Sequence, residues 1–322
     1  MAGLSRRSLT LGALTSLVAC ACQRRSEAAP SPGGAPVPGP EAHGAGPDAG
    51  SAQGGTGGTR LLEWAFEGAV STRTVMLIPN GASSGRYPVL VALHGRGEAR
   101  KPPEEGALGW ARDYALLRAL DRVAAPPLAP ADFEGYVETK RLSDLNGGLS
   151  TAPFGGLIVA CPYVPDIKLE DDRALREFAV FVVSTLLPRV RRETPALATS
   201  AATGIDGVSL GGTVALAVGL GAPSEFGAVG TLQPALDIHD TDRWTRRALE
   251  ARGARPSLAL RLLTSDGDYF RDAVRATSAA WRAAAITHDF EEVVGPHDYP
   301  FNRGPGAIEM LLWHDRVLRR AG

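Results

Sequence analysis

Hydrophobic and polar positions follow two periodicities that alternate along the chain from residue 61 onward. Short aliphatic runs, typical of buried strands, alternate with longer segments in which apolar residues recur at helical spacing, as at Leu175, Phe178 and Val182. The pattern predicts strands over residues 61–66, 72–78, 88–93, 156–161, 228–232, 258–264 and 290–294, and one leading to Ser209. It predicts helices over residues 172–190, 211–220, 244–251, 270–285 and 306–318. We therefore expect an α/β fold, with a mostly parallel sheet, helices on both faces, and functional residues at the carboxyl ends of strands.

The N-terminal segment, residues 1–22, does not share this alternation. Residues 5–9 (S-R-R-S-L) have the form of a twin-arginine export signal, and the apolar run that follows is shorter than the about 20 residues that span a bilayer. The run ends in L-V-A-C (residues 17–20), which resembles the lipobox of bacterial lipoproteins and makes Cys20 the expected lipidation site. We expect a protein exported by the twin-arginine route and lipid-anchored to the bacterial cell envelope, in the periplasm or at the cell surface. An ordinary cleaved signal with an incidental cysteine is the alternative.

A linker of biased composition follows over residues 23–59. Within residues 29–58, 16 of 30 residues are Gly or Pro, and the only large aliphatic residue is Val37. Such a stretch buries too little apolar surface to offset the entropy lost on ordering, so it is predicted to be a disordered tether. Residues 60–322 then form one domain, which is long enough for a full hydrophobic core.

Charge and composition argue against nucleic-acid binding, a disulfide framework and a bound cofactor. The chain has 34 Lys and Arg against 35 Asp and Glu, so it lacks the positive charge expected of a protein that binds nucleic acid. Two of the three cysteines lie in the N-terminal signal, so we expect no disulfide framework, and Cys161, within an apolar run, is expected to be buried. The sequence contains no residues at metal-ligand spacing and no phosphate-binding loop, and we expect neither a metal nor another cofactor.

A G-x-S-x-G pattern over residues 207–211 supplies a candidate nucleophile, Ser209. In a nucleophile elbow, a strand turns sharply into a helix so that the serine hydroxyl projects above the sheet, and small residues two positions before and after it avoid backbone clashes. The strand predicted before Ser209 and the helix predicted after it supply that setting. A glycine-rich turn with a helix-capping serine is the alternative.

The sequence H-G-R-G (residues 94–97) directly follows the strand predicted over residues 88–93. In proteins with this elbow, the loop at this point and the residue after the nucleophile each donate a backbone N–H group to the oxyanion of the tetrahedral intermediate. We assign these donors to Arg96 and Leu210. His94 is expected to hold the loop rather than to take part in catalysis.

A serine nucleophile needs a base within hydrogen-bonding distance, and one of the six histidines has a suitable place. His297 lies in the loop after the last predicted strand, where the order serine, acid, histidine of α/β-hydrolases puts the base. The others lie in the tether, before the serine, or at other points of the pattern: His43, His94, His239, His288 and His314.

The acid that orients this base is expected after the strand predicted over residues 258–264, where two aspartates occur. It has to be buried against His297, because it holds the imidazole and stabilises the imidazolium. We favour Asp268, with Asp266 as the second candidate, because an aspartate directly before a glycine is typical of a turn. Asp298 is a poor candidate, since adjacent side chains in a loop usually diverge.

Together, residues 204–212, the segment D-Y-F (268–270) and the segment G-P-H-D (295–298) resemble the esterase D, or "putative esterase", branch of the α/β-hydrolase superfamily. This branch includes enzymes similar to enterochelin esterase, feruloyl esterase and S-formylglutathione hydrolase. The resemblance extends over about residues 61–319 and implies an α/β-hydrolase fold. It also favours Asp268, because the acid of this family lies in a D-x-F segment.

Residues 98–154 depart from the pattern of this family. The segment is longer than expected and rich in proline, with helices predicted over residues 110–123 and 141–149. We expect a cap or lid-like insertion that roofs the site, so its length bears on the substrate class more than on the chemistry.

These features predict a serine esterase that cleaves carboxylic esters through an acyl-enzyme intermediate, with Ser209, His297 and Asp268 as the triad. Its partners are expected to be a small-molecule ester and, through the lipid anchor, a membrane; no prediction is made for the oligomeric state. The alternatives are amide or peptide cleavage on the same fold, acyl transfer to an alcohol, and a surface lipoprotein that binds a ligand without turnover.

Overall fold

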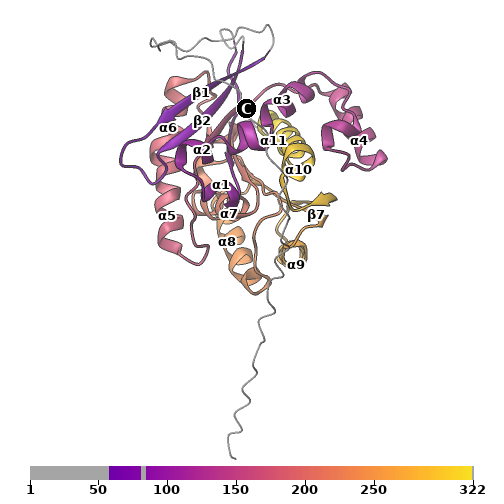
Figure 1. The fold of residues 1–322 in the computed structure, drawn as a ribbon. Coiled ribbons are helices and arrows are strands. Elements are labelled where there is room, and N and C mark those ends of the chain that lie inside the picture. The colour runs from indigo at the N-terminus through magenta and orange to yellow at the C-terminus, as the bar shows by residue number, and fades with distance from the viewer. Residues whose placement is uncertain (1–57, 81–84, 321–322) are drawn as a thin grey trace, which may run out of the picture. The chain divides into compact units, whose positions relative to one another are not determined.

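The computed structural model describes residues 58–80 and 85–320 (Figure 1). The predicted export signal, its lipidation site Cys20 and all but the last two residues of the predicted tether (23–59) lie outside the described residues. Within those ranges, no helix combines the length and the apolar character needed to cross a bilayer.

The described residues form an eight-stranded sheet with the order β1-β2-β4-β3-β5-β6-β7-β8. The strands are β1 (Thr59–Ala65), β2 (Arg73–Pro79), β3 (Val89–Leu93), β4 (Ile158–Pro162), β5 (Thr203–Gly207), β6 (Ala228–Val229), β7 (Ala259–Gly267) and β8 (Asp289–Pro296). The pairs β1–β2 and β2–β4 are antiparallel, and every later pair is parallel. The mostly parallel sheet confirms the predicted fold class, and it brings the carboxyl ends of β3, β5, β7 and β8 to one edge.

Helices cover both faces of the sheet (Figure 1). One face packs against α5 (Asp172–Phe181), α6 (Leu187–Glu193), α7 (Leu210–Gly221), α8 (Thr241–Ala254) and α9 (Arg271–Ala283). The other face packs against α3 (Leu116–Ala124), α4 (Thr139–Thr151) and α11 (Ala307–Arg320). Strand β3 shows the reason: Val89 and Val91 point into the first core, while Leu90 and Ala92 point into the second. Because both faces are buried, the strand reads as a continuous apolar run.

Three predicted elements differ from the structure. The helix expected over residues 172–190 is divided into α5, a π-helical segment η3 (Val182–Leu186) and α6. Pro188 lies in the first turn of α6 and has no N–H to donate to the preceding turn. This missing hydrogen bond accounts for the wider, π-helical turn of η3 before it. The strand expected over residues 228–232 is the two-residue β6, after which Leu232 makes only isolated bridges.

The third difference lies in the segment 98–154. The single helix predicted over residues 110–123 is wrong, because Ala115 has a φ of +49° and separates the π-helical η1 (Gly109–Asp113) from α3. The helix predicted over residues 141–149 lies within α4. Trp110, Leu120 and Leu145 are buried in the second core, so this segment is anchored to the domain, and its role as a cap stays a prediction.

Shorter helices complete the described part of the chain. They are α1 (Arg96–Ala99), α2 (Pro103–Gly106), η2 (Pro130–Phe133), η4 (Ser200–Ala202), η5 (Pro223–Glu225), η6 (Ile238–Asp240), α10 (Tyr299–Phe301) and η7 (Asn302–Gly306). Two of them lie beside predicted site residues, since α1 begins at Arg96 and α10 follows the loop that contains His297.

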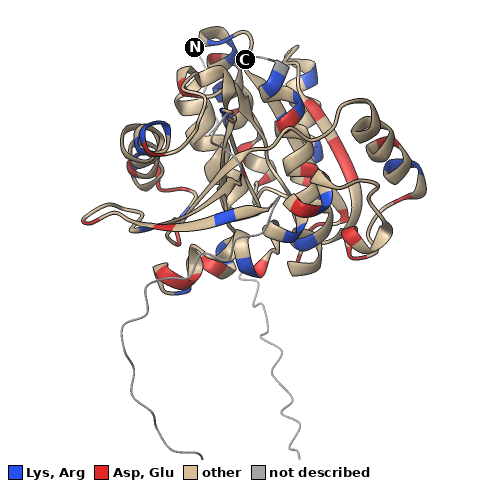
Figure 2. Ribbon diagram, turned by 90° about the horizontal axis from the view of Figure 1, so that it is seen from above, with Lys and Arg blue, Asp and Glu red and all other residues tan. Residues whose placement is uncertain are grey.

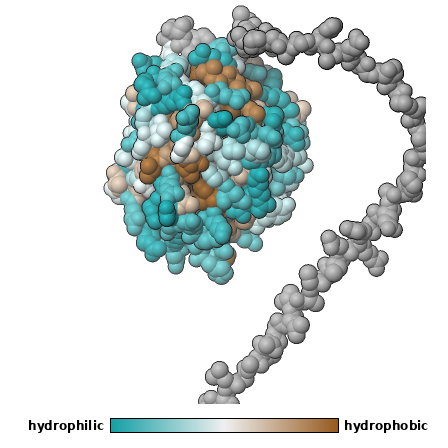
Figure 3. Space-filling view, turned by 60° about the vertical axis from the view of Figure 1, so that its left-hand side comes forward, coloured by the Kyte–Doolittle hydropathy of each residue, from teal (hydrophilic) through white to brown (hydrophobic). Residues whose placement is uncertain are grey.

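Basic and acidic residues are interspersed on the helices (Figure 2), and many form exposed ion pairs, such as Lys140 with Asp144 at 2.6 Å, that add little stability. Figure 3 turns the side of the molecule with α5 toward the viewer and shows hydrophobic patches between hydrophilic ones. Cys161 is buried and unpaired, as predicted.

Candidate active site

Ser209 occupies a sharp turn between β5 and α7. Its backbone has φ +56° and ψ −118°, in the positive-φ region that residues with a side chain rarely adopt. A Cβ atom on Gly207 would lie 2.8 Å from the carbonyl oxygen of Leu93, and one on Gly211 would lie 2.4 Å from the same oxygen. Both positions therefore require glycine, which is the steric reason for the G-x-S-x-G spacing.

The backbone of Ser209 is held from both sides by the loop after β6. Its N–H group donates a hydrogen bond of 3.0 Å to the carbonyl of Leu232, and its own carbonyl accepts one of 3.0 Å from the N–H of Ala235. These bonds fix the unusual conformation, because the serine cannot relax without breaking them.

The two predicted oxyanion donors are the first residues of two helices, Arg96 of α1 and Leu210 of α7. The first amide of a helix has no acceptor within that helix, and neither of these N–H groups has an acceptor among the described residues. The loop of Arg96 lies against the elbow, since a Cβ atom on Gly95 would be 3.8 Å from that of Ser209. Two amides without an acceptor among the described residues thus lie at the starts of the helices beside the serine.

His94 fixes the loop that precedes Arg96. Its Nδ1 donates a hydrogen bond of 3.0 Å to the carbonyl of Gly95, while its Nε2 accepts one of 2.9 Å from the N–H of Val164. An imidazole that donates at one nitrogen and accepts at the other is neutral, and burial lowers the pKa of His94 to about 4. This geometry agrees with the loop-holding role expected from the sequence.

His297 and Asp268 lie in the loops after β8 and β7 and contact one another directly. The Nδ1 atom of His297 donates to Oδ1 of Asp268 at 2.7 Å, and the carboxylate is fully buried while the imidazole is 13% exposed. The carboxylate also accepts hydrogen bonds from the Thr264 hydroxyl at 2.6 Å and from the N–H of Phe270 at 3.0 Å. Because Nδ1 is engaged, Nε2 is the nitrogen of His297 that is free to exchange a proton.

The second candidate acid, Asp266, does not contact His297. It is exposed, and it accepts a hydrogen bond of 2.8 Å from the N–H of Gly295, so it fastens the loop that carries the histidine. Asp298 caps α10 by accepting a hydrogen bond from Phe301. Of the three aspartates considered from the sequence, only Asp268 reaches the imidazole.

Ser209 and His297 lie at the same edge of the sheet, after β5 and β8. No hydrogen bond joins the Ser209 hydroxyl to His297 in this structure. Bonds of this kind are often long in the absence of substrate and tighten in the complex. Two aromatic rings flank the imidazole, Tyr269 at 5.2 Å and Phe270 at 5.4 Å between centroids, and Tyr269 is 82% exposed.

A buried glutamate joins the loop of Arg96 to the loop of His297, and the sequence did not indicate it. Glu98 of α1 is 1% exposed and accepts hydrogen bonds from the hydroxyls of Tyr114 and, at 2.6 Å, Tyr299. Burial and the charge of Glu98 raise the pKa of Tyr114 well above its ordinary value, so this hydroxyl stays a donor. Lys101 lies 3.6 Å from this carboxylate and 2.8 Å from that of Asp113. In a polar segment of the sequence, nothing distinguishes a buried glutamate such as Glu98 from an exposed one.

A second aspartate–histidine pair lies in the core. Nε2 of His314, on α11, donates to Oδ2 of Asp206 at 3.0 Å, and Arg261 of β7 donates to the same oxygen at 3.0 Å. All three side chains are buried. The remaining nitrogen of His314 faces the backbone, since a Cβ atom on Gly204 would lie 2.4 Å from it, and burial lowers the pKa of this histidine.

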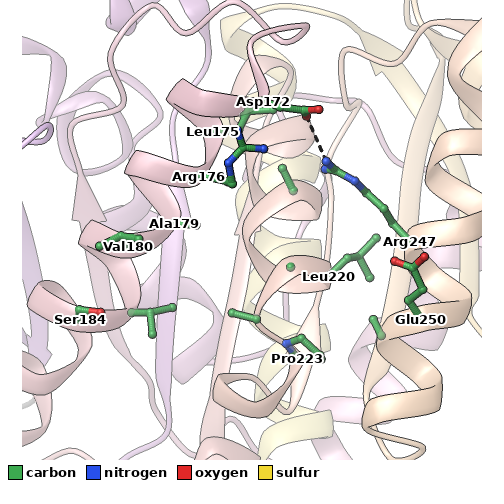
Figure 4. A pocket seen from close by; sticks show the side chains of 15 residues that line it. Asp172, Leu175, Arg176, Ala179, Val180, Ser184, Leu220, Pro223, Arg247 and Glu250 are labelled. Carbon is green, nitrogen blue, oxygen red and sulfur yellow. Dashed lines mark hydrogen bonds and ion pairs between the residues drawn. The ribbon is translucent and has the colours of Figure 1, made fainter.

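A groove of about 630 Å³ lies between α5, α7 and α8 (Figure 4). Leu175, Val180 and Leu220 contribute to its apolar wall, and Arg247 pairs with Asp172 at 3.1 Å. The groove contacts the C-terminal end of α7, whereas Ser209 precedes the N-terminal end of that helix. It is therefore separate from the candidate site. In the described part of the chain, no group of three or more His, Cys, Asp or Glu side chains is arranged to hold a metal ion.

Comparison with known proteins shows a similarity to one family and a shared fold. Residues 170–301 match the model of a family described as Putative esterase, and no curated protein matches the chain. A ferulic acid esterase matches the structure with a TM-score of 0.60 at 16% identity, covering 82% of this chain and 100% of its own.

Two further solved structures agree with this result. The S-formylglutathione hydrolase of Staphylococcus aureus has a TM-score of 0.56 at 11% identity, with 80% of this chain and 99% of that one covered. The enterobactin esterase of Shigella flexneri has a TM-score of 0.51 at 16% identity, with 81% of this chain and 59% of that one covered. The chain therefore has the α/β-hydrolase fold, and the part of it that contains Ser209, Asp268 and His297 is similar to the Putative esterase family.

Proposed function

We propose that the protein is a serine hydrolase that cleaves carboxylic esters. The observation that carries this proposal is the contact between Asp268 and His297, which leaves Nε2 free at the sheet edge where Ser209 occupies its elbow. The family match and the esterases among the solved structures support an ester as the substrate.

The proposed reaction has two halves. Ser209 attacks the ester carbonyl while Nε2 of His297 accepts its proton, and Asp268 stabilises the imidazolium. The N–H groups of Arg96 and Leu210 bind the oxyanion, where each such donor contributes about 3–4 kcal/mol to the barrier reduction. His297 then protonates the leaving alcohol, and an acyl-Ser209 ester forms. In the second half, His297 accepts a proton from water, the hydroxide attacks the acyl group, and Ser209 regains its proton.

Labelling with a fluorophosphonate tests the proposal. The purified protein is expected to form a covalent adduct on Ser209 and to hydrolyse simple esters, and Ser209→Ala is expected to do neither. Failure of the wild type to label, or equal labelling of Ser209→Ala, would show that the proposed mechanism is wrong. Matched ester and amide substrates, with glycerol as a competing acceptor, distinguish ester hydrolysis from amide cleavage and acyl transfer. Binding of a ligand without turnover would leave all of these substrates intact.

We also propose that Cys20 carries a lipid anchor and that the twin-arginine segment directs export to the cell envelope. The support is the sequence of residues 5–20. The intact mass of protein extracted from membranes is expected to correspond to a chain that begins at an acylated Cys20. A soluble product that begins at another residue would contradict the anchor.

A further inference from the structure

Gln233 has an unusual backbone and an unusual environment for a glutamine. It follows Leu232 in the loop after β6, has a φ of +43°, and is fully buried. The left-handed region is unfavourable for a residue with a side chain, and burial of an amide is unfavourable unless its polar atoms are paired. The oxygen of its side-chain amide, Oε1, has no hydrogen-bond partner among the described residues. Two unfavourable features at one position indicate a requirement for its remaining contacts.

The backbone around Gln233 is bonded to the nucleophile. Its neighbour Leu232 accepts the hydrogen bond of the Ser209 N–H, and Ala235, two residues later, donates to the Ser209 carbonyl. The N–H of Gln233 itself donates to the carbonyl of Leu263 on β7 at 2.7 Å. The main chain of Gln233 is thus fixed relative to Ser209.

The side chain of Gln233 reaches the loop of the base. Its Nε2 donates to the carbonyl of Pro296, the residue before His297, at 3.0 Å, and to the hydroxyl of Ser265 at 2.6 Å. The Ser265 hydroxyl in turn donates to the carbonyl of Gly295 at 2.6 Å. The reverse orientation of the amide would place two oxygens against each other at Pro296, so the orientation is set.

These contacts connect the segments of all three proposed triad members. The carbonyl of Ser265 accepts a hydrogen bond of 3.2 Å from the N–H of Asp268, so the residue that Gln233 contacts on β7 is also bonded to the acid. We infer that Gln233 is a positioning residue, whose amide sets the separation of His297 from Ser209. This inference rests on the proposed esterase function.

Two substitutions separate the side chain from the backbone conformation. Gln233→Met keeps the length of the side chain and removes both donated hydrogen bonds. Gln233→Asn favours the left-handed region but is too short to reach Pro296. Both variants are expected to lower kcat for an activated ester by about 10- to 100-fold with KM changed by less than about twofold, because small displacements of a base are costly. Thr277→Val is the matched control, since it removes one buried hydrogen bond, of 2.9 Å to Ala273, on α9.

The decisive measurement is the residual esterase activity of each Gln233 substitution combined with His297→Ala. If Gln233 acts through the base, neither substitution lowers the residual esterase activity further once His297 is absent. A kcat within about twofold of wild type in both variants would overturn the inference, as would an equal loss with and without His297. Failure of the proposed function gives a different result, in which His297→Ala alone is as active as the wild type. Activities are compared at a temperature at which thermal melts show each variant folded, and Gln233→Asn serves if Gln233→Met does not fold.

Discussion

Two aspartate–histidine pairs occur in the described part of the chain, and they differ in the ring nitrogen used, in the exposure of the histidine and in the other partners of the carboxylate. At the sheet edge, His297 uses Nδ1 to contact Asp268 at 2.7 Å and is partly exposed. In the core, His314 uses Nε2 to contact Asp206 at 3.0 Å, and both side chains are fully buried.

The difference shows what a general base needs beyond an acidic partner. The carboxylate of Asp268 has one imidazole and neutral donors as partners, so its charge is available to stabilise an imidazolium. The carboxylate of Asp206 is shared with the guanidinium of Arg261, which already balances its charge. The second nitrogen of His314 is enclosed by backbone, whereas that of His297 lies at the edge that carries Ser209. The first pair therefore suits the proton exchange of the proposed reaction, whereas the second joins β5, β7 and α11.

The largest effect is expected from the acid at the sheet edge. Asp268→Asn should lower kcat/KM for an ester by about 10³–10⁴-fold, because the amide no longer stabilises the imidazolium or holds its tautomer. Asp266→Asn is the matched control and should retain most activity, since Asp266 bonds only to the backbone of Gly295. Steady-state kinetics of both variants provide the measurement, and the reverse ranking would identify Asp266 as the acid.

The core pair should instead determine stability. Asp206→Ala leaves Arg261 and His314 buried without an anion, and we expect the free energy of unfolding to fall by about 3–5 kcal/mol. Asp144→Ala removes an exposed pair with Lys140 and should change it by less than about 1 kcal/mol. Urea denaturation measures both. Equal losses in the two variants would contradict the structural role of the core pair.

Buried neutral histidines also predict how stability depends on pH. The pKa of His94 is about 4 in the folded protein against an ordinary value of 6.5, so the unfolded chain binds more protons between these values. The free energy of unfolding should therefore decrease as the pH falls from about 6.5 to 4, by about 3 kcal/mol from His94 alone. Urea denaturation at several pH values measures this, and His94→Gln, whose amide does not titrate, should show a weaker dependence. An unchanged pH dependence in that variant would contradict the assignment.

The smallest effect is expected from the hydrogen bond between Tyr299 and Glu98, which joins the loop of His297 to the loop of Arg96. Tyr299→Phe removes the hydrogen bond to Glu98 and should lower the free energy of unfolding by about 1–2 kcal/mol and the activity by at most about tenfold. Tyr269→Phe is the control, because Tyr269 is 82% exposed and keeps its ring beside His297. Thermal melts and kinetics of the two variants should differ, and identical behaviour would show that the link has no effect.

The sequence predicted most of the fold because its strands are buried on both faces and its helices carry local apolar periodicity. The break at Ala115 was not predicted, since a left-handed residue between two helical segments is imposed by packing and has no local signal. The short β6 was also missed, because its pairing depends on neighbouring strands.

The candidate site also contains residues that the sequence indicates and residues that it does not. The sequence could nominate Ser209, His297 and Asp268 because each follows a recognisable strand in a known chain order; the structure brings the last two into contact, and their catalytic roles stay a proposal. Glu98 and Gln233 were not identified, because their contacts join residues far apart in the chain. Tyr299, for example, lies 201 positions from Glu98, and Pro296 lies 63 from Gln233. The spacing of residues along the chain does not reveal such contacts.

The rate at which a fluorophosphonate modifies Ser209 in His297→Ala and in His314→Gln tests the central claim most directly, with peptide mapping of the adduct. The reaction needs the base but no particular substrate. The account predicts a second-order rate constant lower by about 10³-fold or more in His297→Ala, and close to that of the wild type in folded His314→Gln. Labelling of Ser209 at the wild-type rate in His297→Ala, or its loss in folded His314→Gln, would contradict the account.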